Sequence, residues 1–172
     1  MTTSSDFDYF LKHGFIENLL PGTSMSSLLT MFGDDKWYIK EKESNGLVYG
    51  IIKIGFIEFH IYNEKVNGIS YRPDLPFSKD DFSGQKIPWI YKDKEISRVE
   101  KYLSAKKIKY KKYVVNGPLE TLTTAGALLL GLEDCEHTFI DTEGGVTFLF
   151  EDNERTNGQE AYQICKYYNI DE

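Results

Sequence analysis

The segment LVYGIIKIGFIEFHIYNEKVNGISYR, from Leu47 to Arg72, decides the predicted fold of this chain. Its first part, Leu47 to Ile54, is a nearly continuous apolar run, which is typical of a strand covered on both faces. Residues 57–62 then alternate apolar and polar side chains, the period of a strand with one buried face. Gly55 and the polar residues 63–65 separate these runs from each other and from a third run. The segment is therefore predicted to be a three-stranded antiparallel meander.

Amphipathic segments on either side of the meander predict helices that cover its apolar face, because a small sheet left open is marginally stable. The clearest is GTSMSSLLTMFG, in which Thr23 or Ser24 caps a helix that Gly33 ends. The predicted fold class is α+β, with antiparallel β-meanders packed against a few short helices. The helices are predicted over residues 6–13, 25–32, 94–106 and 158–168, and further short strands over residues 37–40 and 107–115.

The length of 172 residues favours one compact domain over residues 1–172. The alternative is two packed halves, residues 1–75 and 90–172. Residues 72–89 would then be the connection between them, because this stretch contains three prolines and clustered polar side chains.

An internal similarity decides the prediction for residues 119–132. The sequence AGALLLGLED, from Ala125 to Asp134, aligns without gaps on EGGVTFLFED, from Glu143 to Asp152. The second copy is rich in residues that favour strands. We therefore expect both copies to be strands of a second small sheet.

Composition sets the broad class. Apolar residues make up 41% of the chain, which is enough for a hydrophobic core. The N-terminal sequence has no secretory signal pattern, and no apolar run approaches the length that spans a membrane. The two cysteines suggest neither a disulfide framework nor a zinc site. A cytoplasmic protein that does not bind membranes is expected.

Residues that could carry chemistry are few and scattered. The histidines His13, His60 and His137 have no second metal ligand at helical spacing, so no metal site is predicted. The sequence Cys135-Glu136-His137 could place a thiol beside a base, but a turn is the better interpretation. Phosphate-binding glycine motifs are missing. We predict no catalytic residues and no cofactor.

Charge is unevenly distributed along the chain. Residues 92–112 have a net charge of +6, whereas residues 113–172 have a net charge of −10. The lysines of the basic segment are interpreted as edge protection or internal charge pairing, and nucleic-acid binding is not expected. The acids either form a ridge that attracts a basic partner or only keep the protein soluble. The predicted partner-binding residues are Glu133, Asp134, Glu136, Asp141, Glu143, Glu151, Asp152 and Glu154.

The capped helix that ends in FGDD, the segment NGLVYGIIKIGFIEFHIYNEKVNGISYRP and the acidic second half give the chain a resemblance to a known class. It resembles the small bacterial immunity proteins of polymorphic-toxin and contact-dependent growth-inhibition systems. This resemblance implies a cytoplasmic, non-enzymatic antidote that binds a cognate toxin domain, often a basic nuclease. Two alternatives stay open. One is a small enzyme that uses Glu58, His60 and Cys135, and the other is a ligand- or peptide-binding module with a pocket between sheet and helices.

Overall fold

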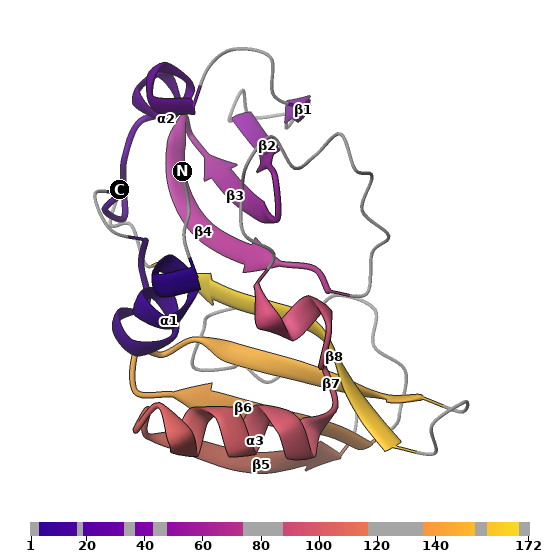
Figure 1. Cartoon of the computed structure of the whole chain (residues 1–172). Helices are drawn as coiled ribbons and strands as arrows, with labels where there is room; N and C mark the ends of the chain where they lie inside the picture. Colours follow the sequence, from indigo (N-terminus) through magenta and orange to yellow (C-terminus); the bar gives the residue numbers. More distant parts are fainter. Residues whose placement is uncertain are drawn as a thin grey trace.

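The computed structural model describes residues 4–16, 19–32, 37–42, 48–73, 88–116, 136–153 and 158–168. Within these ranges, eight strands form one sheet in the order β1-β2-β3-β4-β8-β7-β6-β5, and every neighbouring pair is antiparallel (Figure 1). The predicted α+β class is confirmed. The helices are α1 (Ser4–His13), α2 (Met25–Phe32), the 3₁₀-helix η2 (Trp89–Tyr91) and α3 (Ile96–Ala105), and the strands are β1 (Trp37–Lys42), β2 (Val48–Ile54), β3 (Ile57–Tyr62), β4 (Lys65–Tyr71), β5 (Tyr110–Asn116), β6 (Glu136–Thr142), β7 (Thr147–Asn153) and β8 (Gly158–Tyr167).

The meander predicted from the sequence is formed by β2, β3 and β4, and β1 pairs with β2 as its fourth strand. Both hairpin turns are two residues long. Gly55 takes a positive φ in the first turn, and Asn63 and Glu64 both do so in the second. Two successive positive φ values are what a type I′ turn needs, and this turn matches the right-handed twist of the strands.

The two halves of the chain share this sheet. Strands β1–β4 come from the first half and β5–β8 from the second, and β4 and β8 are the neighbours that join them. Their pairing spans Gly68–Tyr71 on β4 and Ile164–Tyr167 on β8. We call this four-residue pairing the seam. The first part of β8 instead meets the segment before α3, where Ala161 N–H donates to the carbonyl of Lys94.

A hydrophobic core fills the space between the helices and one face of the sheet. Each helix contributes fully buried side chains, among them Phe10 of α1, Leu28 of α2 and Leu103 of α3. They pack against strand residues such as Phe59 and Phe148. A second cluster, of Phe139, Leu149 and Cys165, lies on the opposite face of the sheet, which we call the second face.

Two described helix ends show how the chain satisfies its terminal backbone groups. Ser24 Oγ accepts the backbone N–H of Ser27 at 3.1 Å and caps α2. The chain leaves α3 through Lys107, whose φ is +56°, and Ile108 N–H returns to the carbonyl of Leu103 at 2.9 Å. This is the Schellman arrangement, in which glycine is the usual residue at the left-handed position.

The helix predicted over residues 158–168 is wrong, because this segment is strand β8. The prediction relied on an apolar spacing of three and four between Ala161, Ile164 and Cys165, which is normally a helical signal. In the structure the pairing of β8 with β7 skips Tyr162, so that this residue forms a β-bulge.

The bulge explains the misleading spacing. Because one extra residue is inserted, Ala161 and Ile164 both pack into the main core although they are three positions apart. Cys165 faces the other way and is part of the second-face cluster. It is fully buried, as expected for a small core residue, but not on the face that the helix prediction gave it.

The repeat predicted at residues 125–134 and 143–152 is described only in its second copy. That copy contains β7, so its strand prediction is correct. The strand belongs to the same sheet as the meander, however, and not to a separate small sheet. The first copy and the rest of residues 119–132 lie outside the described residues.

Candidate functional site

The fold divides the predicted acidic ridge into two groups. Asp141 and Glu143 lie where β6 turns into β7, whereas Glu151 and Asp152 lie near the far end of β7. At about 3.4 Å per residue, four residues of strand place Thr147 and Glu151 roughly 14 Å apart. Three of the predicted acids lie outside the described residues, and Glu136 begins β6 with a side chain that is not described; the three are Glu133, Asp134 and Glu154.

The acids at the β6–β7 turn are tied into the fold. Asp141 Oδ1 accepts a 2.6 Å hydrogen bond from the hydroxyl of Thr147, and Lys111 is its cross-strand neighbour on β5. Glu143 sits beside Lys109, whose carbonyl accepts the Glu143 N–H at 2.8 Å. Both acids at this end therefore have a lysine of β5, or of the residue just before it, as a neighbour.

The acids at the far end of β7 stand beside further carboxylates. Glu151 lies directly opposite Glu160 on β8, and Glu160 in turn forms an isolated bridge with Glu95. The exposed Asp152 accepts a 3.3 Å hydrogen bond from Gln159 Nε2. We call Glu95, Glu151, Asp152 and Glu160 the acidic end.

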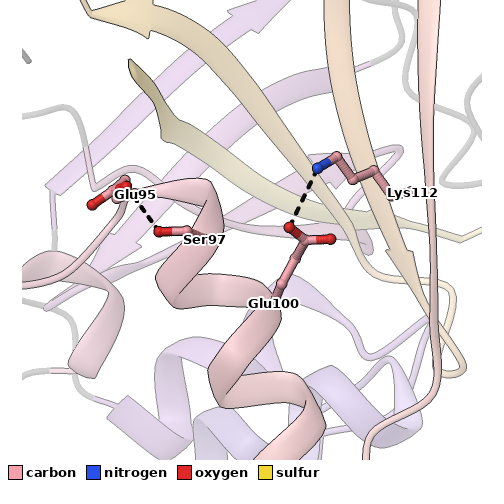
Figure 2. A network of polar contacts seen from close by, with 4 residues as sticks. All are labelled: Glu95, Ser97, Glu100 and Lys112. Atoms are coloured by element: carbon pink, nitrogen blue, oxygen red, sulfur yellow. Dashed lines mark hydrogen bonds and ion pairs between the residues drawn. The ribbon is translucent and has the colours of Figure 1, made fainter. Parts of the chain in front are cut away.

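One lysine partly balances the acidic end. Lys94 Nζ lies 3.1 Å from Glu160 Oε2. The hydroxyl of Ser97 donates to Glu95 Oε1 at 2.8 Å (Figure 2). Like charges directly opposite each other on neighbouring strands destabilise a sheet. The acidic end therefore concentrates negative charge at a cost to the free energy of folding.

Several cations of the basic segment, residues 92–112, are paired with acidic side chains. Within the described part of the chain, four of its cations form ion pairs: Lys94 with Glu160, Arg98 with Asp93, Lys106 with Asp8 and Lys112 with Glu100. Figure 2 shows the last pair, 3.3 Å long, which connects α3 to β5. Strand β5 is also the terminal strand of the described sheet. These positions favour edge protection and charge pairing over a nucleic-acid surface.

Two of the three residues of the enzyme hypothesis meet on the second face. Ser70 Oγ donates to Glu58 Oε2 at 3.2 Å and lies 2.9 Å from His60 Nε2. Because the serine proton is directed to Glu58, His60 Nε2 carries the hydrogen and donates to Ser70. The third residue, Cys135, lies outside the described residues.

This arrangement lacks the order of a nucleophile, base and acid relay, in which the histidine stands between the other two groups. Here Ser70 is between His60 and Glu58, and the serine is fully buried. Burial, followed by the charge of Arg72, lowers the pKa of His60 to about 4. The imidazole is therefore neutral at pH 7 but a weak base, which suits structure better than proton transfer.

The remaining candidates from the sequence occupy separate places. His13 is exposed at the end of α1, against the rings of Tyr9 and Phe15, and His137 is buried in β6. Burial, with a smaller contribution from Asp141, raises the pKa of the Cys165 thiol to about 12. No group of three or more metal-ligating side chains occurs among the residues that the structure describes.

Residues that complete these sites were missed in the sequence. Glu95 and Glu160 are 65 positions apart, and nothing in their local patterns shows that they become neighbours. Ser70 and Tyr167 join the cluster around His60 through strand register alone. A correct strand assignment for residues 158–167 would have been the only signal for Glu160 and Tyr167.

Comparisons with protein-family models, curated proteins and solved structures found no match to this chain. No helix in the described ranges is both long and apolar enough to cross a membrane. A functional assignment must therefore be argued from the surface of this protein itself.

Proposed function

We propose that this chain is a non-enzymatic cytoplasmic antidote that binds a basic toxin domain and neutralises it. The observation that supports the proposal is the acidic end, where Glu151 and Glu160 face each other across neighbouring strands and Glu95 adjoins them. Cationic side chains of a partner would relieve this repulsion, so that complex formation gains what the free protein loses.

The composition of the surrounding surface fits a protein partner. Glu151 and Glu160 point to the second face, where the partly buried Tyr162 follows two residues after Glu160. Tyrosine supplies contact area with little loss of side-chain entropy and is enriched at interfaces. The net charge of −7 would also accelerate the encounter with a cationic domain.

The acids at the two ends of the β6–β7 hairpin have different parts in this proposal. Asp141 is the cross-strand neighbour of Lys111, and Glu143 is joined to Lys109 through the backbone, so nearby lysines offset part of their negative charge. Glu151 and Asp152 are exposed at the opposite end. We therefore assign the contact with the partner to Glu151 and Asp152.

The test is binding of the protein to the C-terminal domain of the protein encoded beside it, measured by calorimetry at low and high salt. Wild type should bind stoichiometrically and more weakly as salt rises. The variant Glu151→Lys/Asp152→Lys should bind at least about tenfold more weakly at low salt and with a shallower salt dependence.

A matched control changes the net charge equally at a distance. Glu64 and Glu143 are exposed turn residues, so Glu64→Lys/Glu143→Lys has the same charge but keeps the acidic end. It should retain most of the affinity. Equal losses in the two variants, with folding verified by urea titration, would show that only net charge matters and would refute the assignment.

A further inference from the structure

The seam between the two halves of the sheet is short and carries a polar cluster. Only four residue pairs join β4 to β8 in the described sheet. The cross-strand row through its end contains His60 on β3, Gly68 on β4 and Tyr167 on β8. His60 and Tyr167 thus touch across the strand that separates them, and their contact extends over the seam.

Gly68 makes this contact possible. A Cβ atom at Gly68 would lie 2.6 Å from Cδ1 of Tyr167, so the tyrosine ring occupies the space that any other side chain would take. The ring meets the His60 imidazole edge to face, with centroids 5.0 Å apart, and its hydroxyl is 3.5 Å from Nε2. Tyr167 is also the last residue of β8, and the next N–H, of Tyr168, donates to the Asn67 carbonyl at 2.7 Å.

The surroundings of His60 favour the neutral imidazole over the charged one. Its side chain is 6% exposed, and Nδ1 has no hydrogen-bond partner among the described residues. Nε2 donates to Ser70, which separates the ring from the carboxylate of Glu58. The positive charge of Arg72 acts on the ring from β4.

The neighbouring strands complete these surroundings. On β2 the cross-strand neighbour of His60 is the apolar Ile51, and Lys53 lies opposite Glu58. On β3 itself, Tyr62 follows on the same face two residues later. From β8 the Tyr167 ring and its hydroxyl face the imidazole, and Cys165 lies opposite Ser70 on the same face. The carboxylate of Glu58, which adjoins this cluster in the described structure, accepts the hydroxyl of Ser70.

We propose that the seam is an acid-sensitive joint, in which protonation of His60 displaces Tyr167 and opens the end of the β4–β8 pairing. A charged imidazole must reach water or a carboxylate, and the imidazole is instead buried with the Tyr167 ring packed edge to face against it. Displacing the ring removes the packing of the last residue of β8 on Gly68, so we expect the adjoining hydrogen bond from Tyr168 N–H to Asn67 to open. The Tyr168 hydroxyl still donates to the Gly14 carbonyl at 2.8 Å. The two halves of the sheet then stay joined by the remaining seam pairs, so opening is local.

The size of the response follows from the pKa of His60, which is about 4 in the closed seam and takes its ordinary value of 6.5 when open. The open form binds the proton more tightly, so the opening constant rises as the pH falls. Between pH 7 and pH 5 it should increase about 20-fold.

Hydrogen exchange tests the joint directly. The protection factor of the Tyr168 amide, corrected for the intrinsic pH dependence of exchange, should fall about 20-fold between pH 7 and pH 5. Amides between β5 and β6, such as that of Thr138, should not share this response. In His60→Gln the fall should vanish, whereas His137→Gln, which removes another buried histidine away from the seam, should retain it.

Three results would overturn the proposal. They are an unchanged protection factor at Tyr168 in wild type, a fall of equal size at β5–β6 amides, and the same pH response in His60→Gln as in wild type. If His60→Gln does not fold, His60→Asn provides the same comparison. The β5–β6 amides of wild type give an internal control that needs no variant.

Discussion

Two glycines with the same backbone conformation allow one long-range contact to be measured. Gly14 follows α1 with φ of +78°, and Gly22 precedes α2 with φ of +80°. A Cβ atom at Gly22 would meet nothing within 4 Å, whereas at Gly14 it would collide with the carbonyl of Gly144. Gly144 lies in the β6–β7 turn, 130 residues away, so the contact joins α1 to the second half of the sheet.

Alanine at either position has the same backbone penalty. A left-handed conformation costs an alanine about 1–2 kcal/mol, and this is the whole cost expected for Gly22→Ala. Gly14→Ala adds overpacking against backbone that cannot rotate away, which costs about 1–3 kcal/mol more. Gly144→Ala should show the overpacking alone, because its Cβ would lie 2.7 Å from Gly14 N and its φ is not positive.

Urea unfolding followed by circular dichroism gives the three free energies, with the slope checked for two-state behaviour. For a chain of this size, each kcal/mol lowers Tm by about 2–4 °C, so Gly14→Ala should melt several degrees below Gly22→Ala. If the two variants had the same free energy of unfolding, the close approach of Gly14 to Gly144 would make no contribution to stability. The reasoning from backbone contact would then be wrong.

Three further outcomes can be measured on single sites. Lys107→Gly should raise the free energy of unfolding by about 0.5–1 kcal/mol in urea titration, because it removes a side chain from the left-handed position after α3. Thr142→Val should lower it by about 1–3 kcal/mol, because the threonine hydroxyl donates to the Leu11 carbonyl at 2.6 Å. Cys165, buried with a pKa raised to about 12, should react with iodoacetamide at pH 8 only on unfolding, as measured by mass spectrometry of its peptide.

The sequence predicts local structure well where the pattern agrees with the packing. The meander follows from strict alternation in residues 57–62 and from two tight turns, and the structure has all of its strands. Strand β8 was not predictable in the same way. A single bulge at Tyr162 shifts the alternation by one residue, and a strand with a shifted alternation imitates the spacing of a helix.

The candidate sites depend on which residues of neighbouring strands face each other, and composition carries no information about this register. Glu151 and Asp152 were found because their charge is visible in the sequence. Glu95 and Glu160 are brought together by the path of β8. The residues of β8 that precede Ile164 no longer pair with β4, and Glu160 there forms a bridge with Glu95 in the segment before α3. The cluster around His60 likewise requires three strands in one order.

The basic and acidic segments are separate in the sequence but lie next to each other in the fold. The basic strand β5 pairs with β6, and Lys111 there lies opposite Asp141, so the most basic and most acidic segments are neighbours. The negative charge that the pairing of β5 with β6 does not offset lies at the end of β7, where carboxylates face each other. If these acids served only solubility, their repulsion would lower the stability of the fold without need, because the substitution Glu151→Lys would remove it. Its presence at an exposed strand end is why we place the contact with a basic partner there.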